Sequence, residues 1–343
     1  MSKSFAKYVI TDKTLVHIGS IEKLISIIDQ GDVSNIAKNR IINESLFDDL
    51  FALNNFLNLG LTLGEVKKIS IGKDIDTTEA KLLSNIRQVN DFIRNNFKEK
   101  EFVFNFHFIQ HIVKLLQSNM LEVWDIGKIR SGGEIIDEKF ELENQTYFRT
   151  DTTNFLAEHI LWVEEEKNIH PIIKACVFMT FINRYSPFVG LNYISSLVFF
   201  RLILDKFGYS SIYRLPLFKL LLINRQEFHR KINEVAGNDL EISDFIELVS
   251  TNLYELIYQY KKSLIKFDYF DMKSNSDQID LNERQVRLLK ILHHKLFIRR
   301  YEYVKLFKVS PMTAYRDLNF MVERKMLIVS GNGKSTTYSL STR

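Results

Sequence analysis

The feature that most constrains the fold of this chain is a pair of apolar runs separated by a short polar break. Ile172–Ile182 and Ile194–Leu204 each have the composition of a buried helix. In the break, Pro187 has no backbone N–H to donate and Gly190 frees the chain locally, so we expect the first helix to end there. We expect Asn192 to cap the second helix. A tight loop that feeds a helix N-terminus inside a buried hairpin is a natural cradle for an anion.

The residues around this break resemble the signature of the Fic/Doc family, H-P-F-x-[D/E]-G-N-G-R-x-x-R, which lies at the junction of two buried helices. The aligned positions run from Ser186 to Leu197. Three of them match the signature: Pro187, Phe188 and Asn192. Upstream, Ile169–Ala175 resembles the helix that leads into the motif, and Gly127–Arg130 is similar to the G-x-F-R segment that opens the family's substrate-aligning flap. The resemblance implies a mainly α fold, a Fic-type helical domain with a small β-hairpin flap.

Two motif positions that carry out chemistry in the family hold different residues here. The family's His is a general base that removes a proton from a hydroxyl of a target protein. Ser186 stands at that position, and a serine does not titrate near neutral pH. The family's carboxylate holds the magnesium ion that bridges the nucleotide phosphates, which is a task for hard oxygen ligands. Gly190 stands there and offers none.

The phosphate-binding positions differ as well. In the family, glycines let backbone N–H groups approach the phosphates, and arginines clamp them through forked, charge-assisted bonds. Leu191 and Tyr193 occupy the glycine positions, and Ile194 and Leu197 occupy the arginine positions. The resemblance therefore implies a degenerate Fic motif with no catalytic residue, no metal site and no ATP or magnesium cofactor.

Two other functions stay open at this point. One is that of a divergent Fic-type AMP-transferase that acts on a protein hydroxyl with ATP and magnesium, and the other is that of a scaffold that senses nucleotides or binds a protein. Retained ATP binding without turnover favours the sensor, and measurable labelling of a target favours the enzyme.

The last part of the chain reads as a separate module. Asp268–Asp280 is predicted to be a linker, because KSNSDQ breaks the apolar periodicity. Ser310 followed by Pro311 is a strong helix start. The predicted elements are a helix from Asn282 to His294, a second over Arg300–Phe307, a third from Pro311, and strands over Leu327–Val329 and Thr336–Leu340 around the turn Gly331–Lys334.

This order of elements over residues 281–343 resembles the winged helix-turn-helix domains of bacterial regulators, and S-x-x-T-A-x-R-D-L resembles the versions appended to many Fic proteins. The third helix is expected to enter the major groove of DNA, and the wing to reach backbone phosphate or the minor groove. The predicted DNA-binding residues are Ser310, Met312, Thr313, Arg316, Asn319 and Lys334. Winged helices also serve as dimerisation or protein-docking modules, so that alternative stays open.

The distribution of charge favours DNA. Residues 281–343 contain 13 Lys and Arg against 4 Asp and Glu, a net charge of +9, whereas the rest of the chain carries −5. A basic end on a slightly acidic body is the pattern of a protein that binds nucleic acid at one end. We therefore expect a DNA-associated transcriptional regulator without nucleotidyl-transfer activity.

The remaining residues are predicted to form two further regions. At 343 residues, with only 4 Pro and 13 Gly, the chain exceeds one typical domain and favours helices. Residues 1–75 form an N-terminal region, and residues 76–267 form the Fic-like core. The expected elements are strands over Tyr8–Ile10 and Leu15–Ile18 and helices over Ile21–Asp29, Phe47–Leu57, Leu82–Asn96, Phe104–Leu116, Phe218–Ile223 and Ile242–Leu264, with the flap hairpin over Ile129–Leu142.

Three smaller features complete these expectations. Ser34–Asn39 resembles the family's inhibitory helix motif, [S/T]-x-x-x-E-[G/N], with Lys38 at the glutamate position. His107 and His111 are spaced for one helix face, but no third metal ligand is identifiable, so ordinary packing is the default. Cys176, the only cysteine, lies in an apolar run and is expected to be a small buried hydrophobe.

The sequence also suggests where the protein works. A lone cysteine fits a reducing compartment. No charged-then-apolar leader opens the chain, and no uncharged run reaches about 18 residues, so we expect a cytoplasmic bacterial protein that neither spans nor binds a membrane. A homodimer and a protein partner stay open.

Overall fold

The structure is a computed structural model, and it describes most of the chain. The described residues are 5–30, 35–96, 102–131, 140–141, 149–209, 215–237, 241–274, 281–294, 297–324, 326–331, 333, 336–341. For residues 29–30, 35–43, 262–274, 286, 290, 293–294 and 340 only the backbone is described. The side chain of Lys38 in the predicted inhibitory motif, most of the predicted flap and Lys334 of the predicted wing therefore lie outside the described residues.

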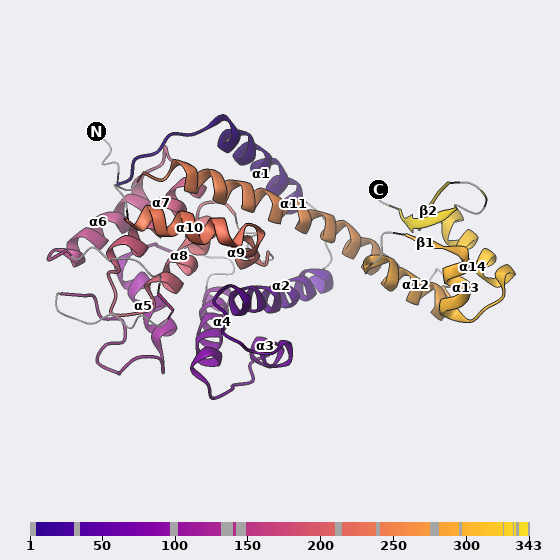
Figure 1. Ribbon diagram of the computed structural model, residues 1–343, viewed down its shortest axis with the longest axis horizontal. Coiled ribbons are helices and arrows are strands. Elements are labelled where there is room, and N and C mark those ends of the chain that lie inside the picture. Colours follow the sequence, from indigo (N-terminus) through magenta and orange to yellow (C-terminus); the bar gives the residue numbers. More distant parts are fainter. Residues whose placement is uncertain are drawn as a thin grey trace. The chain divides into compact units, whose positions relative to one another are not determined.

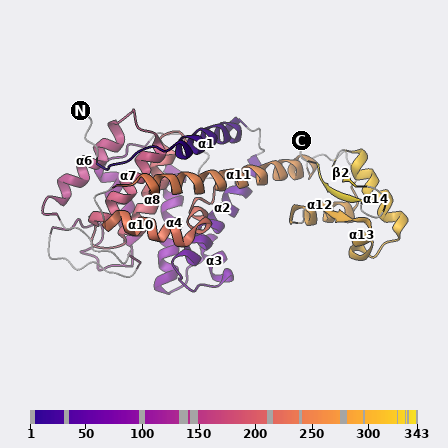
Figure 2. The ribbon, with the colours of Figure 1, turned by 45° about the horizontal axis from the view of Figure 1, so that its top comes forward.

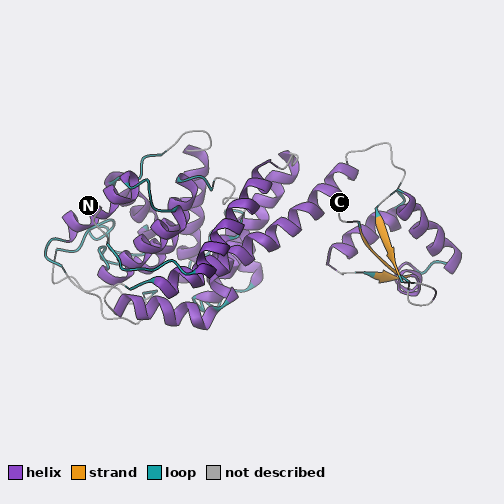
Figure 3. Cartoon of the chain, turned by 90° about the horizontal axis from the view of Figure 1, so that it is seen from above, coloured by secondary structure: helices purple, strands orange, loops and turns teal. Residues whose placement is uncertain are grey.

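The chain forms two compact units. The larger comprises Met1–Asp32 and Lys38–Tyr260, and the smaller contains Lys261–Arg343. Among the described residues, strands occur only in the smaller unit, which confirms the predicted mainly α fold class (Figure 3). The helices of the larger unit are α1 (Asp12–Gln30), α2 (Asn35–Phe56), α3 (Leu63–Ser70), α4 (Thr78–Asn96), α5 (Phe106–Gln117), α6 (Thr152–Glu165), α7 (Pro171–Tyr185), α8 (Asn192–Lys206), η2 (Leu217–Lys219), α9 (Leu220–Ile223), α10 (Arg225–Gly237) and α11 (Ser243–Ser274).

Helices α7 and α8 form the centre of the larger unit (Figure 1). Every residue of Ile172–Arg184 and of Asn192–Leu204 is buried, as the two apolar runs predict. Pro171 begins α7 because its missing N–H has no intrahelical partner there in any case. Phe178 contacts Phe199 of α8 at a ring-centroid distance of 5.7 Å. These helices therefore bring the motif loop between them into the protein interior.

A buried ion pair fixes α8 to α2. The Nη1 atom of Arg201 lies 2.6 Å from Oδ2 of Asp49, and both side chains are buried. The second carboxylate oxygen accepts from the backbone N–H of Phe218 at 2.7 Å. Burial raises the pKa of Asp49 to about 6, although the charge of Arg201 acts in the opposite direction. The side chain of Arg201 is thus committed to the core, well away from solvent.

The N-terminal region differs from the predicted strands. Leu15–Ile18 lies inside α1, and Tyr8–Ile10 forms no strand, so both predicted strands are wrong. Read over a longer window, the buried positions Thr14, Ile18 and Ile21 have helical spacing, and this pattern outweighs four consecutive apolar-rich residues. Helix α1 lies along α11 (Figures 1 and 2), joined by a 3.1 Å ion pair between Lys13 and Glu247.

Helix α11 extends further than predicted. It was expected to end at Leu264, but it continues to Ser274 and so occupies the first part of the predicted linker, Asp268–Asp280. Residues 268–272 contain neither Pro nor Gly, and the polar turn residues begin only at Lys273. Nothing in the sequence before that point ends the helix.

The smaller unit has the predicted order of elements. Its helices and strands are α12 (Glu283–His294), β1 (Ile298–Arg299), α13 (Arg300–Phe307), α14 (Pro311–Glu323), β2 (Leu327–Ser330) and β3 (Thr337–Leu340). The antiparallel sheet has the order β1-β3-β2, with Val329 paired to Tyr338. Asn282 caps α12 as predicted: its Oδ1 accepts from the N–H of Gln285 at 3.1 Å. The two-residue strand β1 was not predicted, because it is too short to show a pattern.

Candidate functional sites: a filled helix N-terminus and an exposed recognition helix

The motif loop between α7 and α8 turns twice through left-handed backbone. Ser186 ends α7 with a φ of 39°, and Leu191 precedes α8 with a φ of 56°. Gly190 was expected to supply the local freedom, but the positive φ falls one residue later, on a leucine. A left-handed non-glycine residue costs about 1–2 kcal/mol and persists only where the surroundings hold it. Leu191 is held by packing, since only 4% of its surface is exposed.

The segment Lys128–Arg130 pairs with the motif loop. Ile129 forms an antiparallel bridge with Phe188. The backbone N–H of Arg130 donates to Pro187 O at 2.9 Å, and its guanidinium donates to Ser186 O at 3.2 Å. The segment that resembles the start of the family's flap thus pairs with the motif loop and holds its first half.

The second half of the loop is held by a buried glutamine of α5. Gln117 accepts from the N–H of Gly127 at 2.6 Å and donates to Gly190 O at 2.7 Å. No part of Gln117 is exposed, so neither bond competes with water. The loop backbone is therefore fixed from two directions by residues far away in the sequence.

The cradle at the start of α8 is occupied by a carboxylate of the chain itself. One oxygen of Glu141 accepts from the backbone N–H and the side-chain amide of Asn192 at 2.6 and 3.1 Å. Its other oxygen accepts from the N–H of Tyr193 at 2.9 Å. Unpaired N–H groups and the helix dipole favour an anion at this end of a helix. The Glu141 carboxylate accepts hydrogen bonds from these N–H groups and places a negative charge at the positive end of the helix dipole.

Asn192 therefore has a different role from the predicted one. It is the first residue of α8 and does not cap it; the preceding Leu191 makes no side-chain cap bond either. The side chain of Asn192 instead spans the loop, accepting from the N–H of Phe188 at 2.9 Å and donating to Phe188 O at 3.0 Å. The prediction was wrong because capping was judged from local sequence, whereas Glu141 reaches the helix N-terminus from elsewhere.

The other aligned motif positions are packed into the interior. The side chains of Leu191, Tyr193, Ile194 and Leu197 are each at most 4% exposed. The Tyr193 hydroxyl has no hydrogen-bond partner among the described residues, and burial raises its pKa. The side chains at these four positions supply neither a positive charge nor a carboxylate. No group of three potential metal ligands occurs in the described part of the chain. His111 packs on Phe92, with ring centroids 4.7 Å apart.

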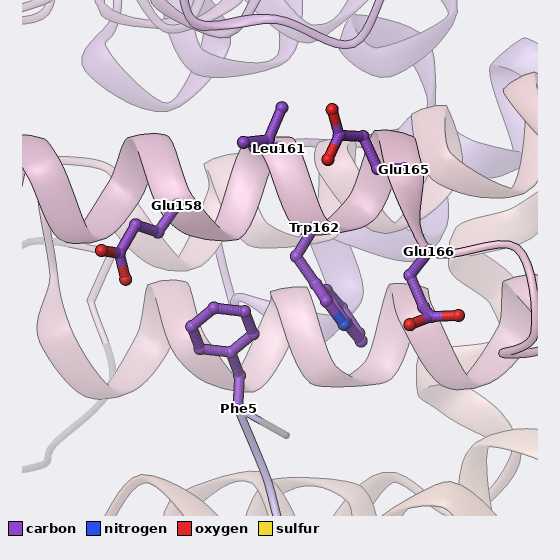
Figure 4. Close-up of a pocket in the computed structure, with 6 residues that line it drawn as sticks. All are labelled: Phe5, Glu158, Leu161, Trp162, Glu165 and Glu166. Carbon is purple, nitrogen blue, oxygen red and sulfur yellow. The ribbon is translucent and has the colours of Figure 1, made fainter. Parts of the chain in front are cut away.

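A hollow of about 370 Å³ lies elsewhere in the larger unit, along α6 (Figure 4). It is lined by Phe5, Glu158, Leu161, Trp162, Glu165 and Glu166. Phe5 and Trp162 lie side by side, with Glu158 and Glu166 on either side of them. Because these carboxylates repel phosphate groups, the hollow is a poor candidate for a nucleotide site.

The predicted recognition helix, α14, is built as expected. Ser310 Oγ accepts from the N–H of Thr313 at 3.1 Å and caps the helix. Met312 and Arg316 point to solvent, with 61% of Met312 exposed. Thr313 is only partly exposed, and Asn319 is partly buried and donates to Glu323 at 2.8 Å. Of the predicted DNA-binding residues within the described part of the chain, Ser310, Met312 and Arg316 are exposed.

A buried carboxylate orients α14. Asp317 accepts from the amide of Asn282 at 2.8 Å, from Nε of Arg284 at 3.0 Å and from the hydroxyl of Tyr303 at 2.9 Å. Burial alone raises the pKa of Asp317, but these hydrogen bonds outweigh it and lower the pKa below 3.8. Asp317 adjoins Arg316 in sequence but faces inward, so it ties the helix to α12 and α13.

Sequence reasoning missed Glu141 and Asp317. Both are acidic residues whose partners lie far away in the chain, and neither belongs to a spacing pattern. Asp317 was visible only as a member of the S-x-x-T-A-x-R-D-L run. Glu141 carried no signal at all.

Comparisons with known proteins agree with this architecture. Residues 284–333 match the DeoR-like helix-turn-helix domain family. No curated protein matches the chain. The chain is similar in structure to a Fic family protein from Desulfovibrio desulfuricans G20, with a TM-score of 0.62, 17% identity and 98% of each chain covered. It is also similar to Fic-1 from C. elegans, with a TM-score of 0.54, 17% identity, 77% of this chain and 74% of that chain covered.

These similarities confirm the predicted fold: the chain has the Fic fold and carries a C-terminal helix-turn-helix domain. None of the helices among the described residues is long and apolar enough to cross a membrane.

Proposed function

Because the chain combines the Fic fold with a DeoR-like helix-turn-helix domain, we propose that it is a DNA-associated transcriptional regulator that does not transfer nucleotides. The observation that carries the proposal is the exposed face of α14, where Arg316 has no ion-pair partner among the described residues. An arginine with free donors at this place on a recognition helix can pair with the edge of a guanine.

The charge of the smaller unit supports DNA as the partner. Residues 281–343 carry a net charge of +9, which attracts a phosphate backbone and makes binding depend on salt. Non-specific affinity then arises from the whole basic surface, whereas sequence preference arises from α14.

The filled cradle supports the absence of transfer. Glu141 occupies the N–H groups that would receive a phosphate, and the general base, metal ligand and arginines of the family motif are replaced by Ser186, Gly190, Ile194 and Leu197. We therefore assign the chain no ATP or magnesium cofactor. The old site then serves as a structural junction.

Binding to duplex DNA tests the proposal. Fluorescence anisotropy with labelled random and selected duplexes should show salt-dependent binding by the full chain. Arg316→Ala should cost roughly 1–3 kcal/mol on the preferred sequence and relax the preference. Lys334→Ala should weaken all sequences about equally. Arg287→Ala, at an exposed position on α12, is the matched control for loss of one positive charge. Absence of duplex binding by the full chain at low salt would refute the proposal.

Incubation with labelled ATP, magnesium and lysate tests the second part of the proposal, that the chain does not transfer nucleotides. We expect neither a labelled target nor self-labelling. Labelling that disappears in Asn192→Ala would show that the site is an enzyme after all.

A further inference from the structure

The smaller unit contains a cavity of about 680 Å³, and none of the predicted DNA-binding residues that the structure describes lines it. Its walls come from three places: the junction of β1 and α13, the first residue of α14, and the β2–β3 hairpin. The residues are Arg299, Arg300, Tyr301, Val304, Pro311, Gly333 and Thr336. We call this cavity the arginine cleft.

The lining of the arginine cleft is basic. Two of its described lining residues are arginines, and none of them is acidic. The nearest carboxylate in sequence, on Glu302, is engaged at the start of α13, where it accepts from the backbone N–H of Arg299 at 2.8 Å. An anion in the cleft therefore meets positive charge and hydrogen-bond donors.

The two guanidinium groups are available to a ligand. Neither Arg299 nor Arg300 forms an ion pair with another described residue. The Nε atom of Arg299 is buried and has no hydrogen-bond partner. Arg300 lies over the ring of Tyr315, with Cζ 5.0 Å from the centroid, which holds the side chain in one direction. Arg300 is exposed, so its guanidinium can offer charge-assisted hydrogen bonds to an oxyanion in the cleft.

The N-termini of two helices add to the positive electrostatic potential at the arginine cleft. Arg300 is the first residue of α13, and Pro311 is the first residue of α14. Because both residues line the cleft, the positive ends of both helix dipoles lie beside it. The arginines and the two helix N-termini thus all favour a negative charge in the arginine cleft.

We propose that the arginine cleft seats a phosphate oxyanion, supplied by the DNA backbone next to the base pairs that α14 reads. This inference rests on the proposed function, and it adds a second contact outside the recognition helix. A phosphodiester is favoured over a free phosphate because the cleft begins at Pro311, where the recognition helix itself starts.

The test compares full-length variants in anisotropy titrations with random duplex at several salt concentrations. Arg299→Ala combined with Arg300→Ala should weaken all sequences alike and lower the slope of log affinity against log salt by roughly 0.9, since the cleft neutralises one phosphate. Arg299→Lys combined with Arg300→Lys should retain most of the slope, because the charge remains. Arg287→Ala with Arg324→Ala is the charge-matched control, and thermal melting confirms that each variant is folded.

The outcomes separate this inference from the proposed function. If the wild type binds duplex and the double alanine variant keeps its slope, the inference fails and the proposed function stands. If the wild type does not bind duplex at all, both fail. Inorganic phosphate, titrated without DNA, distinguishes the sources: binding tighter than millimolar that the double alanine variant loses would assign the cleft to a free phosphate and overturn the duplex assignment.

Discussion

The motif loop and the predicted recognition helix differ in whether their hydrogen-bond donors already have partners within the chain. In the loop, the amides of Asn192 and Tyr193 are satisfied by Glu141. On α14, Arg316 extends into solvent, and the buried Nε atom of Arg299, a residue that lines the arginine cleft, has no hydrogen-bond partner among the described residues. A donor that already has a hydrogen-bond partner gains little free energy from a ligand, whereas a donor without a partner gains a hydrogen bond.

This difference supports the proposed function in a way that the fold alone does not. A Fic fold hosts chemistry only where the site offers free donors, charge and a base. In the larger unit the N–H groups at the start of α8 are satisfied within the chain. In the smaller unit Arg316 is exposed, and the following predictions test that contrast.

The largest effect is expected at the buried ion pair. Arg201→Met removes the partner of Asp49 and should cost about 3–5 kcal/mol of the free energy of unfolding, because a carboxylate is left unpaired in the core. Arg316→Met, the matched exposed change, should stay within about 0.5 kcal/mol. Urea denaturation followed by circular dichroism measures both. Similar losses at the two arginines would contradict the contrast.

The cost of Arg201→Met should depend on pH. The folded-state pKa of Asp49 is raised from 3.8 to about 6 in the wild type, and removing Arg201 raises it further. A raised pKa means that the folded state binds more protons than the unfolded state, so stability falls as pH rises through this range. The difference between variant and wild type should therefore be larger at pH 8 than at pH 5. A constant difference would show that Asp49 keeps its charge throughout.

The next effect is expected at Asp317. Asp317→Ala leaves the donors of Asn282, Arg284 and Tyr303 without their acceptor, which should cost roughly 2–3 kcal/mol in the smaller unit. Asp317→Asn keeps one acceptor oxygen and should cost less. Since the pKa of Asp317 is lowered, its contribution is present above the unfolded value of 3.8 and is lost as pH falls through the folded pKa. Thermal melting between pH 3 and 7 measures this loss, and an Asp317→Ala melt that varies with pH as the wild type does would refute it.

Local signals explain which parts could be predicted. The helix starts at Asn282 and Ser310 follow from cap chemistry within three residues, and the structure confirms both. The apolar runs of α7 and α8 predicted buried helices because their periodicity is contained in one segment. The same reasoning failed at Leu15–Ile18, where the window was too short to distinguish a strand from a turn of helix.

The contacts that decide the sites are not local. Glu141 meets Asn192 across 51 residues, and Asp49 meets Arg201 across 152. No propensity or spacing records such a pairing, because it depends on how distant helices pack. The left-handed backbone at Leu191 was not predicted either, because the sequence pointed to Gly190 and the positive φ lies on the next residue. Whether the motif positions are chemically silent stays a prediction.

A smaller effect is expected at Glu141. Glu141→Ala should cost about 1–3 kcal/mol, because the N–H groups of Asn192 and Tyr193 lose their acceptor. Glu141→Gln retains an acceptor and should cost less, and Glu165→Ala, at an exposed position on α6, should stay within about 0.5 kcal/mol. Calorimetric titration with ATP and magnesium should show no binding tighter than millimolar to the wild type. Micromolar affinity there would favour a nucleotide sensor.

The smallest effect is expected from restoring the base. Ser186→His places an imidazole at a buried, left-handed position whose carbonyl is held by Arg130. No gain in nucleotide transfer should follow, because the metal ligand and the phosphate clamps are still replaced at Gly190, Ile194 and Leu197. Combining Ser186→His with Glu141→Ala empties the cradle and removes the internal competitor for phosphate. Labelling with ATP and magnesium should stay at background in both variants. Labelling in the combined variant alone would show that Glu141 is the main barrier, and that the larger unit keeps a latent transfer site behind it.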